Sequence, residues 1–227
     1  MDHFYIPTKD TDDWRKLLAD PDRQWRDGFS AQMLAASWQG AGGFPAEVKA
    51  SFRASAIPLL QELEFIAGFP EHKVALPGGG ASSQPDIMVV ARSGGELVVV
   101  AVEGKVEEGF RELVSAWRQS ASEGKAKRLR FLTERLSLGS KGSDALDKVH
   151  YQLLHRAASA LLTAERLSAR HAVMLVHSFS SKQKSFDDYA AFLELFDLTA
   201  KDGSVQSAGK RGKGSDTELY FSWTVGA

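Results

Sequence analysis

The chain of 227 residues carries 43% hydrophobic and 25% charged side chains, which is the composition of an ordinary globular protein with a single domain. This composition excludes a mainly disordered chain, and the absence of cysteine excludes disulfide frameworks, thiolate metal sites and cysteine nucleophiles. The net charge is −1, so any contact with nucleic acid has to rest on local basic patches, for which 125–130 and 209–214 are the candidates. The alternative, which we favour for both segments, is a solvated surface helix end at 125–130 and a flexible loop at 209–214.

The longest apolar run, 97–102, is too short to span a bilayer, and the first thirteen residues carry four aspartates and no apolar stretch. We therefore expect a cytoplasmic protein that makes no membrane contact.

The predicted elements begin with short helices over residues 1–45, where aromatic and charged side chains are mixed. A helix is predicted from Pro45 to Ala67, because leucines recur at core spacing, with a kink at Pro58 and an end at Gly68 and Pro70. Three strands are predicted next, at 72–76, 86–91 and 96–103, with the glycine-rich segment 77–85 as the loop between the first two.

The second half of the chain is predicted to alternate between helices and strands. The expected elements are helices at 111–122 and 144–168, a buried strand at 172–179, a helix at 186–196, a loop at 199–216 and a last strand at 218–225. This order is typical of an α/β domain with a central sheet flanked by helices.

The pair of strands around Gly94 and Gly95 is the most informative part of the sequence. A two-residue glycine turn between two apolar runs is a strong hairpin signal. With these glycines as the turn, Val90 faces Val99 and Asp86 lies directly across from Glu103. Directly opposed residues have Cβ atoms about 4.5–5.5 Å apart, so two carboxylates would repel each other there unless a cation is near.

Lys105 points to the same face as Glu103, because side chains alternate along a strand. Two carboxylates, water and a substrate oxygen make a hard site that suits Mg²⁺ or Mn²⁺. Such an ion polarises a phosphodiester, and a neighbouring lysine can orient the attacking water or neutralise charge on phosphorus. The alternative is a charged hairpin end that faces solvent without any chemistry.

The sequence Pro85-Asp86 followed by Glu103-Gly104-Lys105 resembles the PD-(D/E)xK motif of the restriction-endonuclease-like nuclease superfamily. The chain is also similar to a group of uncharacterised bacterial proteins that carry this motif. The resemblance covers residues 46–180 and implies an αβββαβ core, with 1–45 as an N-terminal helical arm and 181–227 as a C-terminal helix, loop and strand. It implies Asp86 and Glu103 as metal ligands, with the Gly104 carbonyl as a further ligand, and a catalytic role for Lys105.

Other residues are candidates for supporting roles beside the motif. Ser83 and Gln84 adjoin Asp86, and the glycines before them could let backbone amides approach a phosphate. Gln152 and Arg156 lie on one predicted helix, where Gln152 could hold a water at the metal and Arg156 a phosphate. Glu62 and Glu64 could add a carboxylate. In each case ordinary surface or loop chemistry is the alternative.

We expect a metal-dependent nuclease that hydrolyses phosphodiester bonds in DNA ahead of RNA, with Mg²⁺ or Mn²⁺ as cofactor. A catalytically inactive module that binds nucleic acid or protein on the same fold is the alternative. A second copy of the chain as a partner, in a homodimer, stays open.

Overall fold

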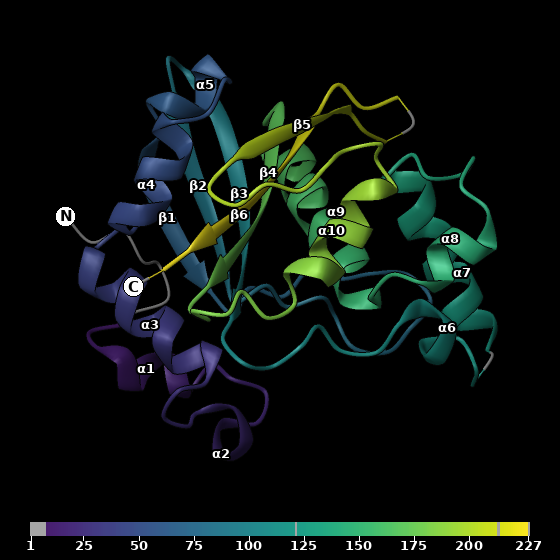
Figure 1. The fold of residues 1–227 in the computed structure, drawn as a ribbon, viewed down its shortest axis with the longest axis horizontal. Helices are drawn as coiled ribbons and strands as arrows, with labels where there is room; N and C mark the ends of the chain where they lie inside the picture. Colours follow the sequence, from purple (N-terminus) through teal and green to yellow (C-terminus); the bar gives the residue numbers. More distant parts are fainter. Residues whose placement is uncertain (1–7, 121, 213, 227) are drawn as a thin grey trace.

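The computed structural model describes residues 8–120, 122–212 and 214–226. Within them, a six-stranded mixed sheet runs through the middle of the molecule and has helices on both faces (Figure 1). The order across the sheet is β1-β2-β3-β4-β6-β5. The strands are β1 Glu64–Pro70, β2 Ile87–Ser93, β3 Glu96–Lys105, β4 His171–Ser178, β5 Val205–Lys210 and β6 Glu218–Val225. The predicted α/β class is confirmed at this level.

The direction of the strands changes across the sheet. Strands β1, β2 and β3 form an antiparallel meander, β3, β4 and β6 are parallel, and β5 returns antiparallel to β6 at the far edge. A parallel neighbour needs a crossover, and the segment between β3 and β4 supplies it. That segment carries α6 Val114–Trp117, α7 Glu123–Arg135, α8 Ser143–Asp147 and α9 Tyr151–Arg166.

One face of the sheet is covered by the N-terminal helices, at the left of Figure 1. They are α1 Thr11–Arg15, α2 Pro21–Gln24, α3 Ser30–Ala41, α4 Ala46–Arg53 and α5 Pro58–Gln61. Trp38 of α3 and Phe52 of α4 belong to the same buried apolar cluster as Val98 and Val100 of β3. The predicted short helices of the arm are confirmed over its described part, while residues 1–7 lie outside the described residues.

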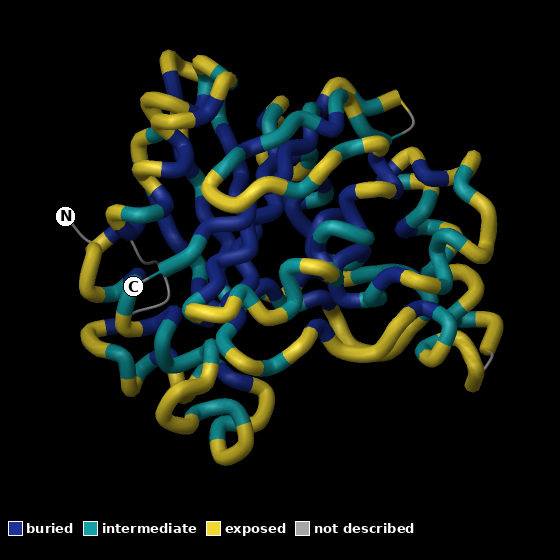
Figure 2. The backbone as a smooth tube through the Cα atoms, in the orientation of Figure 1, coloured by how far each residue is buried: buried dark blue, intermediate teal, exposed yellow. Residues whose placement is uncertain are grey.

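The opposite face packs on α9 and on α10 Phe186–Glu194. Helix α9 turns an apolar side to the sheet, on which Leu153, Ala157, Leu161 and Ala164 are all buried, and Val149, just before the helix, is buried as well. Figure 2 shows the buried backbone concentrated in the sheet and in the helix segments that lie on it.

The prediction of one helix over 45–67 is wrong. Helix α4 ends at Arg53, and Pro58 begins the separate helix α5, because proline fits the first turn and pushes Ile57 out of the helical region. Residues 64–70 then form β1, so Gly68 and Pro70 lie inside a strand. The strand predicted at 72–76 is absent, and a single bridge joins Val74 to Ser83 there.

Three further boundaries differ from the prediction. The helix expected over 111–122 is limited to the four residues of α6, and the helix expected over 144–168 is divided into α8 and α9 near His150, which bridges to Leu113. The basic segment 125–130 lies inside α7, a helix that was not predicted as such. The loop expected over 199–216 contains β5. Its sequence has the composition of a loop, but it forms a strand because it pairs with β6.

The predicted hairpin register is confirmed along the whole β2–β3 ladder. Ser93 pairs with Glu96 at the turn, Val90 with Val99, and Ile87 with Val102 at the far end. Asp86 lies one residue beyond the ladder. None of the described helices combines the length and apolar character that crossing a bilayer requires.

Candidate active site

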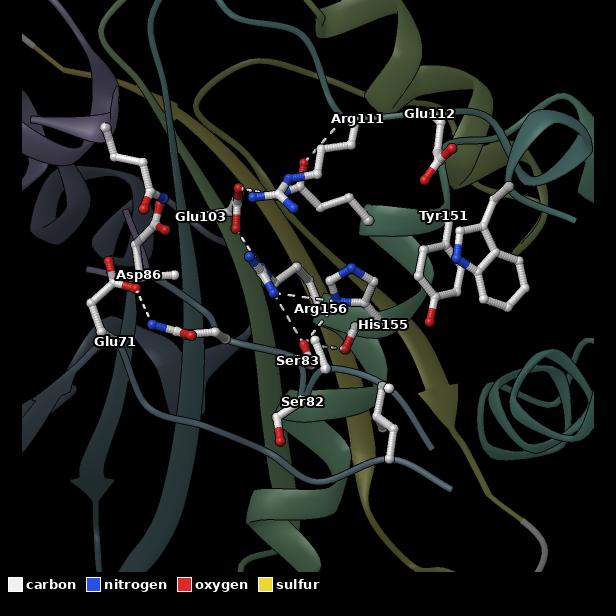
Figure 3. A pocket seen from close by; sticks show the side chains of 18 of the residues that line it. Glu71, Ser82, Ser83, Asp86, Glu103, Arg111, Glu112, Tyr151, His155 and Arg156 are labelled. Atoms are coloured by element: carbon white, nitrogen blue, oxygen red, sulfur yellow. Dashed lines mark hydrogen bonds and ion pairs between the residues drawn. The ribbon is translucent and has the colours of Figure 1, made fainter. Parts of the chain in front are cut away.

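A cleft of about 760 Å³ opens at the end of the sheet where β2 begins and β3 ends. Its walls come from the N-terminal arm, the glycine-rich loop 78–84, the start of α7 and one side of α9. Figure 3 shows Glu71 and Asp86 on one side of this cleft, Glu103 and Arg156 near its centre, and His155 and Tyr151 on the other side. The predicted residues Asp86, Glu103, Lys105, Gln84, Gln152 and Arg156 all line it.

Asp86 is held at the cleft by two hydrogen bonds to the backbone of β3, one on each side of Glu103. Its N–H donates to the carbonyl of Val102 at 3.1 Å, and its Oδ2 accepts from the N–H of Gly104 at 2.7 Å. A Cβ on Gly104 would lie 3.3 Å from this Oδ2 and 3.4 Å from Leu34, so a larger residue here would require Asp86 and Leu34 to shift slightly. No described residue donates a hydrogen bond to Oδ1 of Asp86, which leaves that oxygen available to a ligand.

Glu103 is the centre of a buried ionic cluster. Its side chain is 3% exposed, its Oε1 accepts from Lys105 Nζ at 2.8 Å and from Gln152, and its Oε2 accepts from Arg156. Lys105, 4% exposed, also lies 5.0 Å from the ring centroid of Phe110. A buried carboxylate is stable when it is paired and hydrogen-bonded in this way. Helix α9 supplies both Gln152 and Arg156, as predicted.

The two carboxyl groups have shifted pKa values in opposite directions. Burial raises the pKa of Asp86 to about 7, the charge of Glu103 adds to the rise, and Arg156 and Lys105 oppose it. Burial would also raise the pKa of Glu103, but the charges and hydrogen bonds of Arg156 and Lys105 lower it to about 2. Glu103 is therefore an anion at neutral pH, while Asp86 exchanges its proton near neutrality.

A third carboxyl group, Glu71, lies beside Asp86 and was missed from the sequence. It follows β1 directly, its N–H donates to the carbonyl of Asp86 at 2.8 Å, and its Oε2 accepts from Gln84 at 2.7 Å. Burial and the charge of Asp86 raise its pKa well above the usual value. A correct prediction of strand β1 and of its pairing with β2 would have identified Glu71. This pairing places Pro70 opposite Ile87, and therefore residue 71 beside Asp86.

Ser83 and His155 form a second contact that the sequence did not indicate. Ser83 Oγ lies 2.8 Å from His155 Nδ1 and accepts from Arg156 at 3.1 Å, so it ties the loop to α9 and to the partner of Glu103. Burial, with Arg156 next to it, lowers the pKa of His155 well below its usual value, and the imidazole is neutral.

Some candidate residues lie elsewhere. Glu64 pairs with Arg92 at 2.8 Å on the surface of β1 and β2, and both Glu62 and Glu64 line a different cavity. The patch at 209–214 does not line the cleft, and residue 213 lies outside the described residues. The patch at 125–130 does contribute, because Lys125 and Arg128 line the cleft.

The donor chemistry of the cleft fits a hard divalent cation. Within the described parts of the chain, no group of three or more histidine, aspartate or glutamate side chains is arranged to hold a metal ion. Two carboxylates and a backbone carbonyl are the donors that the motif offers, and all of them are oxygens. Asp86 has one carboxylate oxygen without a donor, whereas Glu103 would have to share its oxygens with Lys105, Gln152 and Arg156.

The fold and the site together define a mixed α/β protein with a charged cleft at one end of its sheet. The sequence profile of the family described as a domain of unknown function (DUF6946) matches residues 7–227, so the chain belongs to this family. No curated protein matches the sequence, and no solved structure matches it.

Proposed function

We propose that this protein is a metal-dependent nuclease of the PD-(D/E)xK type that hydrolyses phosphodiester bonds, in DNA ahead of RNA. The observation that carries the proposal is the arrangement around Glu103: a buried anion bonded to Lys105 and Arg156, with Asp86 beside it, inside a cleft. Such a concentration of perturbed titratable groups in a cleft is typical of active sites.

The topology supports the finer assignment to a restriction-endonuclease-like core. The chain passes from α4 and α5 through the meander β1–β2–β3 to α9 and then to β4, which lies parallel to β3. With α6, α7 and α8 taken as insertions between β3 and α9, this order is compatible with an αβββαβ core. The motif then lies just before the second strand and at the end of the third, and Gln152 lies on the helix that follows.

The reaction is attack of water on phosphorus: the water gives up a proton as the new P–O bond forms, the ester P–O bond breaks, and the leaving oxygen takes up a proton. In this proposal Lys105 orients the water or stabilises charge on the phosphate. Its ammonium group is hydrogen-bonded to Glu103 and lies over the Phe110 ring. Gln152 and Arg156 fix the orientation of Glu103. A divalent cation held by Asp86, Glu103 and the Gly104 carbonyl would lower the pKa of the attacking water and stabilise the developing charge.

One observation favours the alternative, a non-catalytic module that binds nucleic acid or protein. The charge of Glu103 is already compensated by Lys105 and Arg156, so the site is electrostatically stable without an added cation. A module of this kind would use the same cleft for binding and would lack hydrolysis.

The test is cleavage of supercoiled plasmid, linear duplex, single-stranded DNA and RNA with Mg²⁺, Mn²⁺ or chelator. We expect cleavage by the wild type with metal, and Asp86→Asn and Lys105→Ala should each lose about 10²-fold or more of the rate. Glu96→Gln, an exposed carboxylate at the turn of the same hairpin, is the matched control and should cleave like the wild type. Absence of cleavage of all four substrates with either metal would favour the binding module.

Thermal denaturation gives a second readout that does not depend on turnover. A ligand that binds the native state raises Tm, so Mg²⁺ or Mn²⁺ should raise the Tm of the wild type and of Glu96→Gln. The increase should be lost in Asp86→Asn. An equal increase in all three proteins would place the ion outside the cleft.

A further inference from the structure

The glycine-rich loop that borders the cleft has an unusual backbone. Gly78, Gly79 and Gly80 all have positive φ, at 89°, 73° and 74°, a conformation that glycine adopts without steric cost. Residues 79–82 are exposed, and the whole stretch 78–84 lines the same cleft as Asp86 and Glu103.

Arg128 of α7 holds this loop by hydrogen bonds to its backbone. Its side chain is buried, and its guanidinium donates to four backbone carbonyls, those of Leu76, Pro77, Gly79 and Ala81. The carbonyl ends of these peptide groups are therefore drawn toward the arginine. A cation buried under the loop also adds positive potential to it.

The N–H groups of the same loop have no hydrogen-bond acceptor among the described residues. Within residues 8–120, 122–212 and 214–226, none of the backbone N–H groups of residues 78–82 donates a hydrogen bond to a backbone carbonyl or to a side chain. Successive N–H groups without described partners, in an exposed loop with almost no side chains, are donors that an anion in the cleft can reach. The loop also leads directly through Ser83 and Gln84 to Asp86.

The position of the loop is fixed by a contact between two glycines. A Cβ added to Gly78 would lie 2.1 Å from the carbonyl oxygen of Gly124, and a Cβ on Gly124 would lie 2.2 Å from the carbonyl oxygen of Gly78. The loop therefore packs backbone to backbone on the start of α7, where Lys125 adds a further cation to the cleft.

We propose that the loop 78–82 is a phosphate-binding element, which holds a backbone phosphate of the nucleic acid next to the scissile one, and that Arg128 is its positioning residue. The proposal deepens the proposed nuclease function and rests on it for the identity of the ligand. Specificity for sequence is not expected from this element, since contacts to phosphate carry no base information.

The test compares two substitutions of equal shape at Gly79. Nothing lies within 4 Å of a Cβ at this position, and asparagine and aspartate both tolerate its positive φ, so Gly79→Asn and Gly79→Asp differ in charge alone. Gly94, at the hairpin turn, also has a positive φ and an open surrounding, so Gly94→Asn and Gly94→Asp control for a general effect of charge. Ser82→Gln and Ser82→Glu repeat the comparison in case the Gly79 variants fold poorly.

Binding is measured by fluorescence anisotropy with labelled single-stranded and duplex DNA oligonucleotides, in chelator and in Ca²⁺. We expect Gly79→Asp to bind about 10-fold or more weakly than Gly79→Asn, and the slope of log Kd against log salt concentration to fall by about one. The two Gly94 variants should bind alike. Arg128→Lys, which cannot bridge the four carbonyls, should weaken binding, whereas Arg53→Lys, at an exposed arginine of α4 outside the cleft, should not.

The outcomes separate this inference from the nuclease proposal. Equal binding by the Gly79 and Ser82 pairs, an equal effect at Gly94, or no binding of either oligonucleotide by the wild type in both buffers would overturn the inference, even if the protein cleaves DNA. A charge effect confined to the loop in a protein that cleaves nothing would support the inference and overturn the nuclease.

Discussion

Asp86 and Glu103 are similar carboxyl groups in one cleft with different environments. Glu103 has three donors and two nearby cations, whereas Asp86 has one backbone donor and shares its surroundings with Glu71. Because of this difference, Glu103 is the carboxylate that is ionised at neutral pH. Asp86 is the carboxyl group whose ionisation a ligand can change. A bound cation should therefore act mainly on the protonation of Asp86, and its affinity should rise with pH through 7.

The raised pKa of Asp86 predicts a specific pH dependence of stability in chelator. Since its pKa rises from 3.8 to about 7, the native state retains a proton between pH 4 and 7 that the unfolded state releases. Wild-type stability therefore decreases as pH rises through this window, by up to about 1.4 kcal/mol per pH unit from this group. Asp86→Asn lacks the effect, so its stability relative to the wild type should increase from pH 4 to 7 and level off above 7.

Urea denaturation at a series of pH values measures this difference. The control Glu96→Gln should differ from the wild type by less than about 0.5 kcal/mol at each pH, as expected for an exposed surface position. A difference between Asp86→Asn and the wild type that does not change with pH would show that Asp86 titrates as an ordinary carboxyl group.

The sequence predicted the site residues that depend on local periodicity. Strand alternation puts Glu103 and Lys105 on one face of β3, and helical spacing puts Gln152 and Arg156 on neighbouring turns of α9. Asp86 lies one residue beyond the ladder, where its hydrogen bonds to Val102 and Gly104 position it. Glu71 and the contact of Ser83 with His155 could not be predicted, because they depend on how β1 and the loop pack against other elements.

Helix α7 and the glycine-rich loop pack against each other through a close backbone contact between Gly78 and Gly124. This contact could not be predicted, because two glycines far apart in the chain carry no periodic signal. The same limit applies to β1 and β5. Pro58, upstream of β1, is compatible with a kink in one long helix or with the start of a new helix, so the sequence did not show that the helical region ends before β1. The residues of β5 have the composition of a loop. Tertiary pairing decided both cases.

The contact between the two glycines predicts opposite effects for two alanine substitutions in helices. Gly40→Ala in α3 meets no atom within 4 Å and should stabilise the protein by up to about 1 kcal/mol through helix propensity. Gly124→Ala would meet the Gly78 carbonyl and should destabilise by about 1–3 kcal/mol, as overpacking does. Thermal or urea denaturation measures both values, and stabilisation by Gly124→Ala would contradict the packing described here.

The N-terminal helices are part of the whole molecule's core. Trp38 and Leu34 of α3 are fully buried on the sheet, and Trp38 donates to Nδ1 of the buried His177 of β4 at 3.0 Å. Residues 18, 23 and 29 also line the cleft, so the arm contributes to both the core and the site. The match of the family profile to residues 7–227 includes the arm.

Two truncations test this role. Removal of residues 1–28 takes away α1 and α2 with buried Trp14 and should lower stability by about 3 kcal/mol or more while a cooperative transition remains. Removal of residues 1–43 also takes away α3 and uncovers the apolar face of β3, so we expect loss of cooperative unfolding. Circular dichroism during heating measures both, and a cooperative transition near the wild-type Tm in the longer truncation would show that α3 is dispensable.

The β2–β3 hairpin also restricts how the length of this chain can vary in evolution. Residues added at the Gly94–Gly95 turn would lengthen the loop and leave every pair from Ser93–Glu96 to Ile87–Val102 in place. A single residue added within β3 would instead rotate Glu103 and Lys105 to the face that the N-terminal helices cover, since side chains alternate along a strand. Homologues can therefore differ in length at this turn, whereas the distances from the turn to Asp86 and to Glu103 have to stay constant.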